Sequence, residues 1–360
     1  MALRFYITAD EVGSPSGGGQ VTARELDFLE ALGDDVITIS HEELYPLASK
    51  LPDTPFLWDL LAADAVATVL RREKVVHAHF YSGTFTQTIR LLKAQGVFVT
   101  YTCPAHDRKV SAEEFARWGI AYPYPHLADD NLWRVFSGGL READLVFAPS
   151  GVSAAFLRSE GCQEVHVVPH GHSFLEKVPP QPQKFAVGYL GQIGPDKGLI
   201  YLIQAWGLLN FITSPLLLAG RGTEGLEPLI TRLVNRGRFR LMGYVQSPSE
   251  LYVACSIYVQ PSVSEAWGIE VGEAMAHGRP VIVSSGAGAA DLVTDGVDGF
   301  IVPPRDPSAI AEKIRWFSDR PWEIITMGQA ARKKAEENTW SRSREKYLEL
   351  WGSPSPALRS

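Results

Sequence analysis

Strand-length apolar runs alternate with helix-length amphipathic runs along almost the whole of the 360-residue sequence. This alternation is typical of α/β domains with parallel sheets, because each return to a parallel neighbour needs a crossover helix. The runs form two series. Strands are expected in the first series at residues 3–8, 36–40, 75–79, 97–102, 145–148 and 165–168, and in the second at residues 185–190, 215–219, 239–242, 257–260, 280–283 and 299–302.

A proline-rich segment, residues 178–184, separates the two series. Its three prolines disfavour both a helix and an internal strand, so the segment is interpreted as a linker. The chain also exceeds the size at which a single hydrophobic core keeps growing. The sequence therefore predicts an N-terminal Rossmann-like domain at residues 1–177 and a C-terminal Rossmann-like domain at residues 184–337.

Charge and cysteine content exclude several classes of protein. Residues 1–175 carry a net charge of −8 and residues 176–360 a net charge of +1, so an acidic front half argues against binding nucleic acid or a strongly anionic membrane. Cys103, Cys162 and Cys255 are widely separated and odd in number, which indicates neither a disulfide framework nor a zinc knuckle. We expect buried, reduced thiols.

Hydropathy gives no sign of a membrane span, because no stretch approaches the roughly 18 uninterrupted apolar residues that a spanning helix requires. The apolar run at residues 1–8 meets Asp10 and Glu11 at once, which favours a first strand over a signal peptide. We expect a cytoplasmic protein with at most peripheral membrane contact.

Residues 264–283 contain several candidate functional residues close together in the sequence. They follow an expected strand, with Gly268 near a helix start and Gly278 and Pro280 as stop signals. The free backbone N–H groups and the dipole of such a helix N-terminus favour a phosphate group. Glu265 and Glu273 lie eight residues apart, which is roughly 12 Å or less at helical rise. Carboxylates suit sugars and riboses because they accept hydrogen bonds from vicinal hydroxyls.

This segment resembles the E-x7-E signature of retaining glycosyltransferases of family four, and five more segments match that family in order and spacing: residues 188–198, 216–222, 243–245, 260–262 and 295–303. The resemblance implies a GT-B fold, in which two Rossmann-like doubly wound domains face across a cleft. It also implies transfer of a hexose, with retention and without a metal or cofactor, from a nucleotide-diphosphate sugar to a glycan, lipid-linked or small-molecule acceptor. The C-terminal domain would bind the donor and the N-terminal domain the acceptor.

The resemblance further assigns roles to single residues. Glu265 would hold hydroxyls of the transferred sugar, Glu273 the ribose, and Lys197 the diphosphate, offsetting the charge of the leaving group. The remaining donor-binding positions are Gly191, Gln192, Arg221, Tyr244, Val245, Trp267, Gly268, Ile269 and Glu270.

One position departs from the family pattern. Most relatives carry an arginine five residues before the lysine, whereas this chain has Gln192. A fixed cation beside the phosphates is thereby lost. Arg221, in the glycine turn after the next strand, is the candidate to compensate.

The front domain contributes fewer motifs. Gly17, Gly18 and Gly19 lie in a loop that resembles the family's glycine loop near the diphosphate and the acceptor, where glycine permits close approach of the backbone. His106 follows the fourth strand and matches a histidine that relatives place over the reacting sugar, so it completes the expected catalytic set with Lys197 and Glu265. Two histidine pairs, His77 with His79 and His170 with His172, lie in separate loops without a third ligand. No metal site is therefore predicted.

The helix expected at residues 338–352 resembles the family's final helix, which packs back onto the front domain. Two other classes of function stay open: a GT-B sugar-nucleotide epimerase, and a catalytically impaired nucleotide- or glycan-binding protein. The donor base (UDP, GDP or ADP), the donor sugar, the acceptor and the oligomeric state are not specified by any motif.

Overall fold

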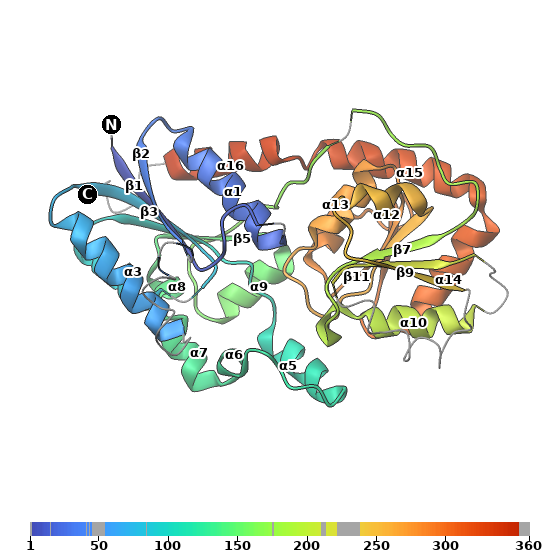
Figure 1. Cartoon of the computed structure of the whole chain (residues 1–360), viewed down its shortest axis with the longest axis horizontal. Coiled ribbons are helices and arrows are strands. Elements are labelled where there is room, and N and C mark those ends of the chain that lie inside the picture. The colour runs from blue at the N-terminus through green and yellow to red at the C-terminus, as the bar shows by residue number, and fades with distance from the viewer. Residues whose placement is uncertain are drawn as a thin grey trace. The chain divides into compact units, whose positions relative to one another are not determined.

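The computed structural model describes residues 2–14, 16–40, 42, 44, 55–83, 85–174, 176–209, 214–221 and 238–352. The chain forms two compact units. Unit 1 comprises Met1–Ala105, Tyr124–His170 and Trp340–Ser360, and unit 2 comprises His106–Pro123 and Gly171–Thr339. Each unit is built around one parallel six-stranded sheet with helices against it (Figure 1).

The sheet of unit 1 has the strand order β2-β1-β3-β4-β5-β6, and every pairing is parallel. Chain direction across the sheet therefore reverses between β1 and β3, which makes that point the topological switch of the unit. The strands are β1 Leu3–Thr8, β2 Asp35–Ile39, β3 Val75–Tyr81, β4 Phe98–Thr102, β5 Leu145–Ala148 and β6 Val165–Val167.

The helices described in unit 1 are α1 Gly17–Glu30, α3 Pro55–Leu70, α4 Thr86–Ala94, α6 Pro125–Ala128, α7 Asp130–Phe136, α8 Gly138–Glu142, α9 Gly151–Ser159 and α16 Trp340–Gly352. The start of α4 has no cap from its own flanking residue. Asp59 of α3 supplies one instead, because its carboxylate accepts hydrogen bonds from the backbone N–H groups of Gln87 and Thr88 at 2.7 and 2.9 Å.

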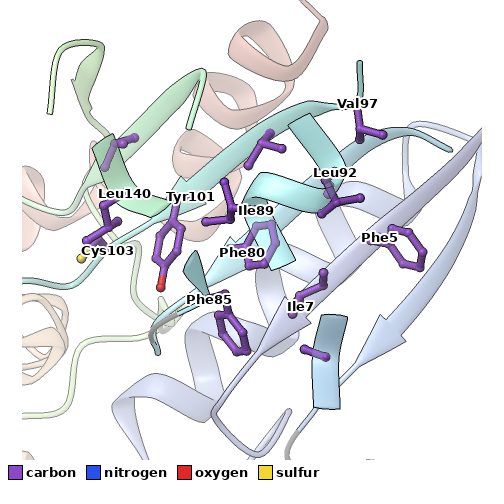
Figure 2. Close-up of a cluster of buried hydrophobic side chains, with 14 of the residues drawn as sticks. Phe5, Ile7, Phe80, Phe85, Ile89, Leu92, Val97, Tyr101, Cys103 and Leu140 are labelled. Atoms are coloured by element: carbon purple, nitrogen blue, oxygen red, sulfur yellow. The ribbon is translucent and has the colours of Figure 1, made fainter. Parts of the chain in front are cut away.

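The core of unit 1 packs apolar side chains of the central strands against α4 and its neighbours (Figure 2). Phe80 and Tyr101 stack with ring centroids 5.7 Å apart, and Phe80 also meets Phe85 at 5.5 Å. Ile89 and Leu92 of α4 are completely buried against this layer. Such aromatic and aliphatic burial supplies most of the stabilisation of an α/β layer, at about 25 cal/mol per Å².

Helix α16 is fixed to unit 1 by a buried polar network around Glu25 of α1. The Tyr347 hydroxyl donates to Glu25 Oε1 at 2.6 Å, and the Tyr6 hydroxyl donates to Oε2 at 3.1 Å. His79 Nε2 lies 3.2 Å from the same Oε2. Burial alone would raise the pKa of Glu25, but the adjacent His79 and these hydrogen bonds hold it below its usual value.

The sheet of unit 2 has the order β12-β11-β10-β7-β8-β9 and is also parallel throughout. Its strands are β7 Val187–Leu190, β8 Leu216–Ala219, β9 Phe239–Gly243, β10 Ile257–Gln260, β11 Val281–Ser284 and β12 Gly299–Val302. Its described helices are α5 Arg108–Arg117, η1 Pro195–Lys197, α10 Leu199–Leu208, α12 Ser249–Ala254, α13 Ile269–Ala276, η3 Gly288–Leu292, α14 Pro307–Asp319 and α15 Pro321–Glu336.

Helix α5 groups with unit 2, although residues 106–123 precede the proline-rich segment in the chain. Its fully buried Glu114 accepts hydrogen bonds from Arg305 Nε at 2.6 Å and from the Tyr201 hydroxyl at 2.5 Å. These contacts connect residues far apart in sequence. A boundary drawn at residue 177 on composition alone therefore differs from the units of the structure, because long-range polar contacts decide where α5 belongs.

All twelve expected strands occur among the described residues, with bounds within two residues of those expected. The break expected at residues 337–339 separates α15 from α16. The three cysteines are free and buried, as expected, and burial raises the pKa of Cys103 and Cys255 to about 12. Within the described residues, no helix is long and apolar enough to cross a membrane.

Candidate active site

The candidate site lies at the topological switch point of unit 2. Strands β7 and β10 are neighbours in the sheet, yet the chain leads from β7 to β8 on one side and from β10 to β11 on the other. The loops after β7 and β10, residues 191–198 and 261–268, therefore leave the same edge of the sheet side by side. Open α/β sheets bind ligands at this kind of point.

Backbone contacts join the two loops. The Asp196 carbonyl accepts a hydrogen bond from the Val263 N–H at 2.7 Å. Gly198 has a φ of 67°, and a Cβ there would lie 2.0 Å from the Pro261 carbonyl oxygen. Only glycine fits such a left-handed position at such close approach. The glycine at the end of the β7 loop thus sets the distance between the loops.

The loop after β10 delivers Glu265 and then starts α13. Its backbone is held by neighbouring residues, since the Glu265 N–H donates to the Gly286 carbonyl at 3.0 Å and the Ala289 N–H donates to the Trp267 carbonyl at 2.8 Å. Gly268 precedes α13 with a φ of 103° and provides no side-chain cap. No preceding side chain caps the first turn of α13, in which the Val271 N–H donates to the Gly268 carbonyl at 3.1 Å. A helix start without a capping side chain is an arrangement that can bind a phosphate group.

Lys197 and Glu265 form an ion pair between the two loops, in which Lys197 Nζ donates to Glu265 Oε2. The two side chains retain 27% and 18% of their exposure, so both remain accessible to a ligand. Burial alone would lower the pKa of Lys197, but the Glu265 carboxylate outweighs burial and raises it. The ammonium group is therefore charged at neutral pH and available to a diphosphate.

Two more carboxyl groups of the site belong to α13, which follows the β10 loop. Burial, together with the charge of Glu265, raises the pKa of Glu270, and burial together with Glu270 raises that of Glu273 to about 7. The Tyr252 hydroxyl donates to Glu273 Oε2 at 2.9 Å. The site thus offers several carboxyl oxygens as hydrogen-bond acceptors. A ligand with several hydroxyl groups matches these acceptors.

His106 belongs electrostatically to the same group of residues. Burial lowers the pKa of His106, and the charges of Glu265 and Lys197 act on it in opposite directions. Its loop is attached to the β10 loop, because the Ser264 hydroxyl donates to the Asp107 carbonyl at 3.3 Å. The imidazole is accordingly neutral at pH 7, with one nitrogen free to accept and one to donate.

The ends of β8 and β9 adjoin the β7 loop. A Cβ on Gly220, which has a φ of 130°, would lie 1.9 Å from the Gly191 carbonyl oxygen. The Arg221 guanidinium lies over the Tyr244 ring, 5.1 Å from its centroid. Gln192 is exposed and Val245 is buried. Gly222, in the same expected motif, lies outside the described residues.

Gly17, Gly18 and Gly19 form the first turn of α1 in unit 1. The Ser16 hydroxyl caps this turn by accepting from the Gly19 N–H at 3.0 Å. A Cβ on Gly19 would lie 2.2 Å from Ser14 Oγ, so a side chain there is excluded. The loop follows β1 at the switch point of its own sheet, which is a ligand-binding position in that unit.

Two residues of the site were not identified from the sequence. Asp196 lies beside Lys197, and burial raises the pKa of its carboxyl group. Tyr252 orients Glu273 from α12. Asp196 could have been identified from the sequence, because it directly precedes Lys197 in the matched motif. Tyr252 becomes a neighbour of Glu273 only through folding.

Two histidines of unit 1, His77 and His79, have structural partners. His77 Nε2 and His79 Nδ1 lie 2.8 and 2.7 Å from Thr100 Oγ1 inside unit 1. Among the residues that the structure describes, no group of three or more histidine, cysteine, aspartate or glutamate side chains is arranged to hold a metal ion.

Comparison with known proteins gives two family matches. Residues 15–173 match the model described as glycosyltransferase family 4, and residues 184–320 match the model described as glycosyl transferases group 1. Among curated relatives, an uncharacterised glycosyltransferase of Methanocaldococcus jannaschii is 31% identical over 47% of this chain and 45% of that protein. O-antigen chain mannosyltransferase B of Escherichia coli is 36% identical over 42% of each protein. The chain spans less than half the length of these relatives.

Solved structures match over nearly the full chain. HepE of Anabaena, in complex with UDP and glucose, is 19% identical with a TM-score of 0.73 and covers 98% of this chain and 100% of its own. Sucrose-phosphate synthase of Thermosynechococcus elongatus is 20% identical with a TM-score of 0.76 and covers 98% of each chain. At this level of identity the likeness shows the fold, and it confirms the GT-B architecture expected from the sequence.

Proposed function

Because the chain belongs to glycosyltransferase family 4, we propose that it transfers a hexose from a nucleotide-diphosphate sugar to an acceptor hydroxyl, with retention and without a metal ion. The observation that carries this proposal is the arrangement at the switch point of unit 2. There the Lys197 ammonium pairs with the Glu265 carboxylate, which lies just before α13 in the chain, and no side chain caps the start of that helix. A cation and a helix N-terminus suit a diphosphate, and the adjacent carboxylate suits the hydroxyls of the sugar.

The donor then has one orientation. Its distal phosphate lies at the start of α13 within reach of Lys197, its ribose hydroxyls donate to Glu273, and the transferred sugar lies by Glu265 and His106. The acceptor is assigned to unit 1, in which the glycine loop of α1 lies at the switch point.

In the reaction, the bond between the anomeric carbon and the phosphate oxygen breaks while the acceptor oxygen bonds to the same carbon on the same face. The acceptor proton passes to the departing diphosphate. Lys197 and the N–H groups of α13 stabilise the negative charge that develops on this leaving group. Neutral His106 can position a sugar hydroxyl through either ring nitrogen.

The decisive experiment incubates the purified chain with UDP-, GDP- and ADP-sugars and a panel of acceptors. A released nucleotide together with a glycosylated product supports transfer. An isomerised donor without an acceptor product would instead identify an epimerase. Nucleotide binding without turnover would identify a binding protein. The exposed Gln192 motivates this alternative, because it replaces the arginine that the family usually has there.

Replacing Glu265 tests the assigned site directly. We expect Glu265→Ala to lower kcat at least about a hundredfold, because it removes a carboxylate that contacts the reacting sugar. Glu312→Ala, which removes an exposed carboxylate of α14, should leave kcat unchanged. Wild-type turnover in Glu265→Ala, with both variants folded by thermal unfolding, rejects the role of Glu265.

A further inference from the structure

A cavity of about 400 Å³ lies in unit 1, among α3, α4, α7 and α8. Its charged lining residues are Asp59, Arg90, Arg134, Arg141 and Glu142. Helix α4 follows β3, on one side of the switch point between β1 and β3. Thr86 and Gln87, which line the cavity at the start of α4, thus belong to a segment that leaves the edge at which an open α/β sheet takes up its ligand.

Three arginines line one cavity in a part of the chain that is acidic as a whole, since residues 1–175 carry a net charge of −8. The two lining carboxylates do not neutralise all three. Both oxygens of Asp59 accept hydrogen bonds from the first turn of α4, through Gln87 and Thr88. Glu142 Oε1 accepts from Arg90 Nε at 2.8 Å and from Arg90 Nη2 at 2.7 Å. The lining therefore retains a surplus of positive charge.

The guanidinium of Arg141 is held in a fixed orientation. Its Nη1 donates to Ser137 Oγ at 2.9 Å and its Nη2 donates to the Arg134 carbonyl at 2.7 Å. Within the described part of the chain, the Arg134 side chain itself makes no hydrogen bond or ion pair. One arginine is thus oriented in advance and a second is available to a ligand, which reduces the entropy lost on binding.

We propose that this cavity binds the phosphate group of a soluble sugar phosphate, which is the acceptor of the transfer. Guanidinium groups match phosphate oxygens in pairs of parallel hydrogen bonds, and the two arginines that do not pair with Glu142, Arg134 and Arg141, suit a dianion better than the single charge of a carboxylate. The volume falls within the range of small-molecule sites and accommodates a hexose phosphate. The acceptor role of this ligand rests on the proposed function, whereas its binding to the cavity does not.

Titration calorimetry of the full chain with hexose 1-phosphates and 6-phosphates tests the proposal, with glucose and glucuronate as matched neutral and carboxylate ligands. We expect at least one sugar phosphate to bind more tightly than both controls. Arg134→Gln should raise its Kd about tenfold, the loss of one charge-assisted hydrogen bond. Arg72→Gln, which changes an exposed arginine of unit 1 outside the cavity, should leave Kd unchanged.

Equal binding of glucose and the sugar phosphates would overturn the proposal, as would an equal effect of Arg134→Gln and Arg72→Gln. Binding to phosphatidic acid vesicles in place of sugar phosphates would overturn it in favour of a membrane surface. Nucleotide diphosphate binding, titrated separately, should be the same in Arg134→Gln as in the wild type. Absence of nucleotide binding would therefore reject the proposed function while leaving the test of the cavity intact.

Discussion

At the scale of single residues, the balance of charge around Lys197 governs donor binding. The Lys197 ammonium interacts with the carboxylates of Glu265, Asp196 and Glu270, and the family's usual arginine is replaced by exposed Gln192. Gln192→Arg should lower the Kd of the preferred nucleotide diphosphate by up to about fivefold, because a partly exposed ion pair contributes at most about 1 kcal/mol. Titration calorimetry measures the change. Gln163→Arg, at an exposed position of unit 1, controls for net charge, and equal or weaker binding in Gln192→Arg contradicts the idea.

A second prediction at this scale concerns the release of a proton from Glu273 when a nucleotide binds. Burial and Glu270 raise the pKa of Glu273 to about 7, so a substantial fraction of its carboxyl groups is protonated at neutral pH. Ribose hydroxyls donate to the ionised form and should lower this pKa, so nucleotide binding at pH 7 is expected to release part of a proton. Calorimetry in buffers of different ionisation enthalpy detects the release. It should disappear in Glu273→Gln, and an unchanged release in that variant contradicts the assignment.

At the scale of elements, a buried hydrogen bond from Tyr347 helps to hold α16 to the rest of unit 1. Tyr347 donates to Glu25 Oε1, and both side chains are almost fully buried. Tyr347→Phe should destabilise the docked helix by about 1.5–3 kcal/mol, because Glu25 loses a donor without access to water. Amide exchange of α16 should then accelerate roughly tenfold or more. Arg344→Gln, on the exposed side of α16, should leave exchange unchanged, and equal exchange in both variants contradicts this role of Tyr347.

At the scale of the whole molecule, buried histidines should make the protein lose stability in acid. Burial lowers the pKa of His170 to about 4 and also lowers that of His77, and both histidines belong to unit 1. A lowered folded pKa gives stability that is present above the unfolded value near 6.5 and is lost as pH falls towards 4. Burial also lowers the pKa of His106, His172 and His277 in unit 2, where the raised pKa of Glu273 acts oppositely, since its contribution is lost as pH rises through about 7. Amide exchange should show lower protection in unit 1 at pH 5 than at pH 7, and equal protection at the two pH values contradicts this.

Local sequence patterns determined the elements of this protein. Apolar runs bounded by glycine, proline and charged residues place each strand within two residues, because hydrophobic periodicity and turn chemistry act over a few neighbouring positions. Glu265 and Gly268 were identified from the segment that follows a strand, and Lys197 from its place in a motif that resembles the family's. Their assignment to catalysis remains a prediction.

Tertiary structure alone decided what depends on contacts between distant segments. The strand order makes β7 and β10 neighbours, so that Lys197 meets Glu265, 68 residues away, and Tyr252 meets Glu273. Glu114 assigns α5 to unit 2 through Arg305, 191 residues further along the chain. The raised and lowered pKa values follow from burial, which no single residue specifies. Sequence determines what is local, whereas the juxtaposition of charges needs the packed chain, because electrostatic interaction depends on distance in space.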